Sequence, residues 1–252
     1  MHEIGQSNTP SDLVREMQRN NVCGAFAVGV QGVGGYDLRT YAAHVLADGA
    51  DILHPVAFFD PRDVQAGQVR SWLRSVKSFG YSGVKIHPRL AGVHLDDSRL
   101  PELLSAASDE GLAVLVCTYL HDRENACIGD AVTQICRLLV QAPEARVILL
   151  HAATTRLLEL AEVARSFPNT LLDLSFTLCR YQGSSIDADI AYLFRTFDQR
   201  LCIGSDSPQY GLSTLRERFE ELADGLGEDK IKNIAYRNIM RFTGLDGADA
   251  AL

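Results

Sequence analysis

The segment VILLHAATTRLLELAEVARSFPNTLLDLS, residues 147–175, decides the fold class. It begins with a short apolar run that ends at His151. A helical stretch over 155–166 follows, and a second apolar run covers 170–176. Pro168 lies just past the expected helix end, where proline stops a helix. A strand, a helix and a second strand in so short a segment are typical of a βαβ unit with parallel strands.

The same alternation extends along the whole chain. Its apolar runs are rich in Val, Ile, Leu and Phe and do not alternate strictly with polar residues, which is typical of parallel strands buried on both faces. The predicted strands cover residues 22–30, 52–59, 83–88, 112–119, 146–152, 170–176 and 200–206. The predicted helices cover residues 10–20, 37–48, 63–79, 98–110, 130–141, 155–166, 187–198, 212–224 and 228–242.

This pattern predicts an α/β fold, a (β/α)8 TIM barrel in a single domain over residues 1–252. The length of 252 residues suits one such barrel, and no linker or shift in composition divides the chain. A doubly wound open sheet is the alternative, and such sheets usually bind a nucleotide through a glycine-rich first turn. The glycine cluster GVQGVGG at 29–35 contains neither GxGxxG nor GxxxxGK[ST]. The barrel is therefore the favoured fold.

The strand count leaves one feature to explain. A barrel strand should precede the helix at 10–20, yet only MHEIG, residues 1–5, stands there. This is too short for a typical barrel strand, and a missing strand would leave unpaired backbone groups along the seam. We therefore expect the first strand to be truncated at the N-terminus, or the gap to be covered in an unusual way.

The net charge, the hydropathy pattern and the cysteine count exclude several classes of function. The net charge of −8 and the pI of about 5.3 argue against nucleic acid or an anionic membrane surface as the main partner. No apolar stretch has the length of a membrane span, and no signal-peptide pattern is present. The six cysteines form no CxxC pair and do not resemble a disulfide framework, so we expect a cytoplasmic protein.

Three polar residues stand where predicted strands end: Cys117 in LAVLVCTYL, His151 in RVILLHAAT and Asp206 in LCIGSDSP. In a barrel of parallel strands, active sites are built at this end. A thiolate, an imidazole and a carboxylate all ligate zinc, and the last two also transfer protons. Alternatives stay open, because Cys117 can be a small apolar residue or a nucleophile, His151 can be structural, and Asp206 can cap a turn.

Further polar side chains follow the predicted strands. Lys85 and His87 point the same way by the period of two. Three arginines lie in loops after strands, where they would bind a carboxylate through bidentate pairs; simple exposure to solvent is the alternative. A tyrosine nearby would add hydrogen bonds or stacking. The candidate substrate-binding residues are Lys85, His87, Arg89, Tyr119, Arg123 and Arg180.

Five segments, taken in order and spacing, resemble the amidohydrolase superfamily, in the branch of metal-dependent hydrolases related to aminocarboxymuconate semialdehyde decarboxylase. The similarity runs from about residue 2 to residue 242. The segments are GVKIHPRLAGVHLDD (83–97), DEGLAVLVCTY (109–119), the segment 147–175 quoted above, LCIGSDSPQYG (201–211) and IKNIAYRNIMRFTGL (231–245).

The resemblance implies one divalent metal, commonly zinc, held by an HxH pair on the first barrel strand, histidines on the fifth and sixth, and an aspartate on the eighth. His151 falls on the sixth-strand position and Asp206 on the eighth. Cys117 stands where the fifth-strand histidine is expected. His2 looks like the second half of an HxH pair whose first half would precede Met1. The candidate ligands are thus His2, Cys117, His151 and Asp206.

The resemblance also implies the chemistry. We expect hydrolysis of an amide, lactone or related bond in a small carboxylated molecule by a metal-activated water. Asp206 would move the proton and His151 would stabilise the oxyanion. The runner-up is nonoxidative decarboxylation at the same site. A metal-free, lactonase-like enzyme or a catalytically inactive barrel stays open, because the HxH motif is cut and Cys117 replaces a histidine. Barrels of this kind are often homodimers.

Overall fold

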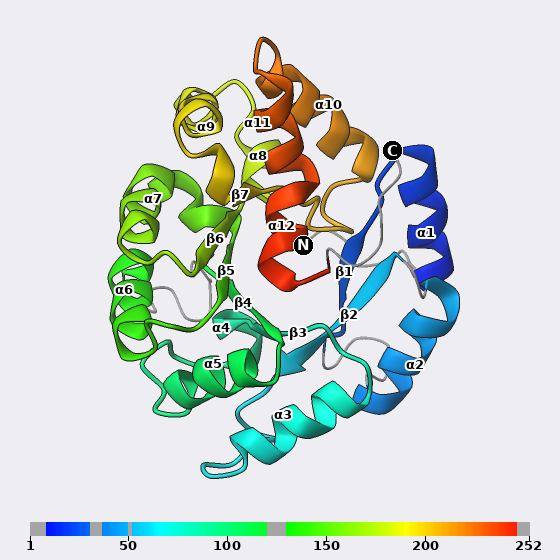
Figure 1. Cartoon of the computed structure of the whole chain (residues 1–252), viewed down its shortest axis with the longest axis vertical. Coiled ribbons are helices and arrows are strands. Elements are labelled where there is room, and N and C mark those ends of the chain that lie inside the picture. The colour runs from blue at the N-terminus through cyan, green and yellow to red at the C-terminus, as the bar shows by residue number, and fades with distance from the viewer. Residues whose placement is uncertain (1–8, 31–36, 50–51, 120–129, 246–252) are drawn as a thin grey trace.

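The computed structural model describes residues 9–30, 37–49, 52–119 and 130–245. Within them, parallel strands form one sheet whose spatial order equals their order along the chain. The sheet curls into an incomplete ring with helices outside it, in which no pairing of β7 with β1 closes the sheet among the described residues, and this confirms the TIM-barrel class (Figure 1). The strands are β1 (Ala25–Val28), β2 (Leu53–Phe59), β3 (Gly83–Ile86), β4 (Ala113–Cys117), β5 (Val147–Leu150), β6 (Thr170–Asp173) and β7 (Leu201–Cys202). The predicted truncated first strand falls on residues outside the described ranges.

Helices connect successive strands, as the alternation in the sequence predicts. The longer ones are α1 (Pro10–Arg19), α2 (Leu38–Gly49), α3 (Val69–Ser78), α5 (Leu100–Asp109), α6 (Ala131–Gln141), α7 (Leu157–Ser166), α9 (Ser185–Thr196) and α10 (Leu212–Ala223). Short ones are α4 (Pro88–Ala91), α8 (Thr177–Arg180), α11 (Glu228–Lys232) and α12 (Asn238–Thr243), the last two joined by a π-helical turn over Asn233–Arg237. The helical segments η1 (His151–Arg156) and η2 (Asp198–Arg200) lie beside β5 and β7.

Local chemistry explains where helix α1 begins and why α3 begins late. The Thr9 hydroxyl accepts the Asp12 amide hydrogen, and the Asp12 carboxylate accepts the Thr9 amide hydrogen, each at 3.2 Å. This reciprocal cap satisfies two amides that a helix N-terminus leaves unpaired. Helix α3 begins at Val69 rather than at the predicted residue 63. The Asp60 carboxylate instead accepts the Arg62 amide hydrogen at 2.8 Å and closes a turn.

All the predicted strands except 52–59 ran past the strand ends that the structure shows, and two of them matter for the site. The predicted strands 83–88 and 170–176 end at Ile86 and Asp173, and short helices α4 and α8 follow each of them. Apolar Leu174 and Phe176 follow β6, so the pattern of hydrophobicity could not mark where the backbone leaves the sheet there, whereas polar His87 and then Pro88 follow β3. These strand ends matter, because they carry side chains of the site described below.

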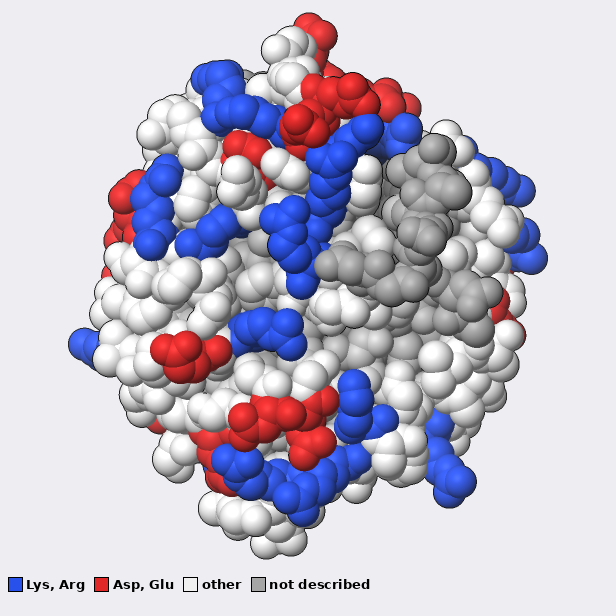
Figure 2. All heavy atoms as spheres, in the orientation of Figure 1, with Lys and Arg blue, Asp and Glu red and all other residues white. Residues whose placement is uncertain are grey.

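The C-terminal helices cover one end of the ring. Ile239 and Phe242 of α12 pack against side chains inside the ring, among them Val56, Leu115 and Ile148. The Phe242 carbonyl accepts a hydrogen bond at 3.1 Å from Arg146 Nη1, directly before β5. This end therefore holds the starts of the strands. It faces the viewer in Figures 1 and 2, and Figure 2 shows Lys and Arg side chains over α11 and α12 interspersed with acidic ones.

The parallel register requires a glycine at the start of β3. Gly83 pairs with Ala113 of β4, and a Cβ atom on Gly83 would lie 2.7 Å from the Ala113 carbonyl oxygen. That distance is well inside van der Waals contact, and the contacting atom belongs to a backbone that cannot rotate away.

We expect Gly83→Ala to lower the free energy of unfolding by about 1–3 kcal/mol, the usual effect of overpacking. Gly24→Ala is the matched control, because a Cβ on Gly24 would meet nothing closer than 3.9 Å. The control should change stability by less than about 0.5 kcal/mol. Urea unfolding measures both, and equal midpoints for the two variants would contradict this explanation.

Candidate active site

A cavity of about 350 Å³ opens at the carboxyl ends of the strands, the end opposite α12. The residues that line it come from the segments that follow β3, β4, β5, β6 and β7. The ring thus brings together side chains that are far apart in sequence. The lining residues are Arg89, Tyr119, His151, Phe176, Arg180, Asp206 and Gln209. Both predicted catalytic residues and three of the predicted substrate-binding residues are among them.

Three of the lining residues have an unusual backbone conformation. His151, Phe176 and Asp206 have φ values of 65°, 65° and 57°. Residues with a side chain seldom adopt this left-handed region, which costs on the order of 1–3 kcal/mol per residue. Such strain persists where surrounding contacts over-determine it, and it concentrates at functional sites. Here it turns each chain sharply as the strand ends, so that the side chain faces the cavity.

Neighbouring hydroxyl groups hold the turn after β5. Residues 151–154 all have positive φ values. The Thr118 hydroxyl accepts the Ala153 amide hydrogen at 2.7 Å, and the Thr177 hydroxyl donates to the His151 carbonyl oxygen at 2.6 Å. The backbone that carries His151 is therefore fixed from both adjacent strand ends.

The His151 ring is buried, with a residue exposure of 4 %. Its Nδ1 atom lies 3.0 Å from both the carbonyl oxygen and the hydroxyl oxygen of Ser175. The edge of the ring meets Phe176, with ring centroids 6.0 Å apart. Ser175 in turn contacts Asp173 at the end of β6. Asp173 and Ser175 were not predicted as site residues, because they lie inside the predicted strand 170–176; their polar side chains after TLL were the available signal.

Cys117 lies fully buried at the end of β4 and does not line the cavity. Burial alone would raise the pKa of its thiol, but hydrogen bonds with His151 and His87 outweigh burial and lower that pKa well below its ordinary value. Burial likewise opposes protonation of His151, yet the Cys117 hydrogen bond and the charges of Cys117, Asp206 and Asp173 raise the pKa of His151.

The described residues do not complete a metal centre. Within residues 9–30, 37–49, 52–119 and 130–245, no three His, Cys, Asp or Glu side chains are grouped so as to hold one ion. Cys117, His151 and Asp206 thus do not form the predicted ligand set by themselves. The fourth candidate, His2, lies outside the described residues. Metal binding stays a prediction of the sequence.

Two arginines give the cavity a cationic character. Arg89 donates from Nε to the Tyr119 carbonyl oxygen at 2.8 Å, and its guanidinium lies 4.6 Å from the centroid of the Tyr119 ring. Arg180 enters from the C-terminal end of α8. The stacking orients the Arg89 guanidinium, whose planar fork suits a carboxylate.

Two other predicted substrate-binding residues, Lys85 and His87, are not among the lining residues. Lys85 is half-buried in β3. His87 is buried; it caps α4 by accepting the Leu90 amide hydrogen at Nδ1, at 3.4 Å, and it contacts Cys117. Arg123 lies outside the described residues. The structure thus gives His87 a place beneath the cavity, and the role of Lys85 stays a prediction.

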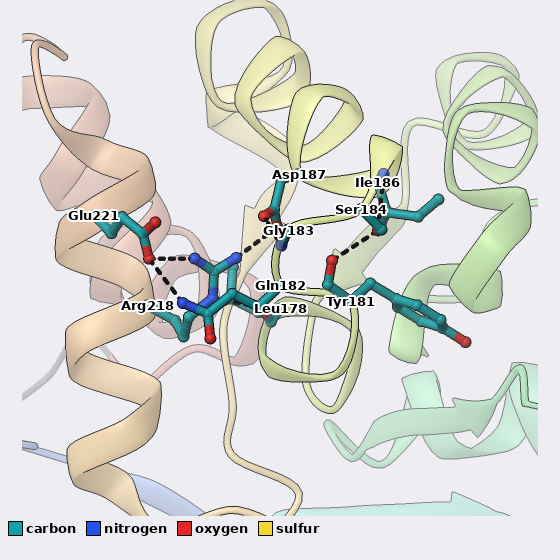
Figure 3. Close-up of polar contacts among 9 residues, drawn as sticks. All are labelled: Leu178, Tyr181, Gln182, Gly183, Ser184, Ile186, Asp187, Arg218 and Glu221. Atoms are coloured by element: carbon teal, nitrogen blue, oxygen red, sulfur yellow. Dashed lines mark hydrogen bonds and ion pairs between the residues drawn. The ribbon is translucent and has the colours of Figure 1, made fainter.

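A buried arginine anchors the segment that carries Arg180. Arg218 of α10 is only 3 % exposed in its side chain. Its guanidinium donates to the Leu178 carbonyl oxygen at 3.2 Å and pairs with Asp187 of α9 and Glu221 of α10 (Figure 3). Since one planar group reaches three acceptors, it ties α8 to both longer helices. Nothing in the helical pattern over 212–224 had marked this residue as buried.

The family comparison agrees with this arrangement. The model of the amidohydrolase family matches residues 15–245. The chain belongs to the amidohydrolase family. It is thus a member of an enzyme superfamily built on the same barrel. The match identifies the superfamily, and the branch related to aminocarboxymuconate semialdehyde decarboxylase stays a prediction.

Solved structures share the fold of this amidohydrolase. An uncharacterised TIM-barrel protein from Bordetella bronchiseptica has 23% identity and a TM-score of 0.74, with 93% of this chain and 82% of that chain covered. Dihydroorotase from Campylobacter jejuni has 16% identity, a TM-score of 0.64 and coverages of 92% and 78%. A 5-carboxyvanillate decarboxylase from Novosphingobium aromaticivorans, with bound manganese, has 14% identity, a TM-score of 0.65 and coverages of 92% and 80%. At these identities the likeness establishes the fold alone.

A search of curated protein sequences found no match. Among the described helices of this amidohydrolase, none is both long enough and apolar enough to cross a bilayer.

We expect Arg218→Lys to lower the free energy of unfolding by about 2–4 kcal/mol, because one ammonium group cannot reach all three acceptors and leaves buried groups unpaired. Hydrogen exchange should also speed up across residues 177–184. Arg216→Lys, on the same helix in a half-exposed pair with Glu220, is the control and should cost less than about 1 kcal/mol. Equal effects of the two substitutions on stability and exchange would count against the anchoring role.

Proposed function

We propose that the protein hydrolyses an amide, lactone or related bond in a small molecule that carries a carboxylate. The observation that supports this most is the content of the cavity, where a carboxylate, a buried imidazole and two guanidinium groups meet. Its volume of about 350 Å³ suits a small molecule. The arginines supply binding, and the other two groups supply proton transfer and charge stabilisation.

Each side chain has a role that follows from its chemistry. Hydrolysis needs a base that takes a proton from water and a donor for the oxyanion that forms. Asp206 is the base, and it passes the proton to the departing nitrogen or oxygen. His151 donates to the oxyanion, because the hydrogen bond with Cys117 and the nearby charges of Cys117, Asp206 and Asp173 raise the pKa of its ring against the effect of burial. Arg89 and Arg180 bind the substrate carboxylate, which holds the scissile bond over the other two groups.

No step of this reaction is assigned to a metal ion, and within the described residues no three candidate ligands are grouped so as to hold one. A divalent ion, zinc by the family resemblance, remains the predicted cofactor. Elemental analysis of the purified protein tests that prediction separately: about one ion per chain supports it.

The distribution of charge on the protein indicates an anionic substrate. The chain carries a net charge of −8, whereas two arginines and one aspartate line the cavity. A cationic cavity in an acidic protein favours small anions over polyanions such as nucleic acids. Cytoplasmic location and assembly as a homodimer remain proposals that rest on the sequence.

An assay with a panel of N-acyl amino acids and carboxylated lactones tests the proposal. Hydrolysis of each compound is measured as the release of acid. With a substrate found, Asp206→Asn should lower kcat by about 10²–10⁴-fold because the base is lost. The fold should survive, since asparagine tolerates the positive φ of this position. The exposed Asp229→Asn, 90% exposed in its side chain, is the control and should keep full turnover.

Two outcomes would contradict the proposal. Full turnover by Asp206→Asn would remove the aspartate from the mechanism. Release of carbon dioxide from a carboxylated substrate, without hydrolysis of any panel member, would establish the decarboxylase alternative.

A further inference from the structure

A buried chain of hydrogen bonds leads from Asp173 to His151. Asp173 Oδ1 accepts two hydrogens from Ser175, one from the backbone amide at 3.0 Å and one from the hydroxyl. Both residues are only 6 % exposed. The carboxylate thus fixes the backbone of Ser175 as well as its side chain. Asp173 Oδ2 faces the Cys202 thiol at 3.7 Å, so both carboxylate oxygens have protein partners.

The direction of these bonds determines which ring nitrogen of His151 carries a hydrogen. Nδ1 lies 3.0 Å from the carbonyl oxygen and 3.0 Å from the hydroxyl oxygen of Ser175. A carbonyl oxygen can only accept, and the single hydroxyl hydrogen is already donated to Asp173. Two acceptors therefore face Nδ1, and Nδ1 must be the donor.

A strained turn aims the same carbonyl at the ring. The Thr177 amide donates to the Ser175 carbonyl oxygen at 2.7 Å, which closes a γ-turn around Phe176 with φ 65° and ψ −56°. Turns of this hand are rare and strained. The carbonyl oxygen has two lone pairs, so it accepts from Thr177 and from His151 together.

The neighbouring strand end leaves room for this arrangement. A Cβ atom on Gly204 would lie 3.1 Å from the Ser175 Cβ and 3.4 Å from Asp173 Oδ2. The absence of a side chain at Gly204 therefore allows Asp173 and Ser175 to sit beneath the cavity.

We propose that Asp173 and Ser175 are positioning residues that hold His151 with Nδ1 protonated, so that Nε2 is the ring atom offered to the substrate. Because Nδ1 donates to Ser175, Nε2 is the ring nitrogen that remains for the Cys117 thiol and for a substrate in the cavity. In the protonated ring that the proposed reaction requires, Nε2–H is then the group that donates to the oxyanion, whereas the neutral ring keeps its hydrogen on Nδ1. The catalytic consequence rests on the proposed function, whereas the tautomer does not.

Nuclear magnetic resonance of ¹⁵N-histidine-labelled protein reads the tautomer directly, without substrate. Spectra are taken at a pH high enough for a neutral ring, and His151→Gln assigns the signal by its loss. The wild-type protein should show a protonated Nδ1 and a bare Nε2. Asp173→Ala frees Ser175, so it should give a mixture of tautomers and an at least 10-fold lower kcat.

Conservative variants separate positioning from general stability. Asp173→Asn keeps an oxygen that can accept both Ser175 hydrogens, so it should restore the tautomer and bring kcat to within about 3-fold of wild type. Ser175→Ala, a milder change, should weaken the tautomer preference if Asp173→Ala does not fold. Thr170→Val removes a buried hydroxyl at the other end of β6, whose bond goes to the Phe167 carbonyl. It should lower stability but leave tautomer and turnover unchanged.

A wild-type ring protonated at Nε2 alone would overturn the inference. So would a folded Asp173→Ala protein with an unchanged spectrum and turnover. If no panel substrate is hydrolysed while the spectra follow the expected pattern, the proposed function fails and the positioning role stands.

Discussion

The parallel hydrogen-bonded register of the strands is the constraint on which the site depends. Because all the strands of the sheet run the same way, their carboxyl ends meet at one end of the ring, and α12 covers the other. His87, Cys117, His151 and Asp173 stand at or just past the ends of four successive strands, and Asp206 follows the next. A shift of one residue in any pairing would turn the corresponding side chain to the opposite face of the sheet.

Position at a strand end is not enough to build the cavity; the backbone must also turn there. His151, Phe176 and Asp206 adopt positive φ values, and hydroxyl groups of Thr118 and Thr177 fix the first of these turns. The polar groups beneath the cavity satisfy one another, which limits the cost of burying them. Strain and buried polarity are thus concentrated where the chemistry is proposed.

The sequence predicted the fold well, because long apolar runs alternating with amphipathic helices leave few alternatives for a chain of this length. It also placed Cys117, His151 and Asp206 at strand ends. The sharp turn after β6 could not be predicted, since apolar Leu174 and Phe176 follow the end of the strand. Asp173 and Ser175 were therefore taken as part of a strand. The burial of Arg218 depends on how α8, α9 and α10 pack, which no local pattern records.

A crystal structure of the Asp206→Asn variant with a bound amide of a small dicarboxylic acid tests most directly whether these strand ends form one reactive centre. The account predicts that the ligand carboxylate lies between Arg89 and Arg180, with its amide carbon beside His151 and position 206. A ligand bound at the α12 end of the ring would contradict it. So would a ligand in this cavity whose amide lies away from both His151 and position 206.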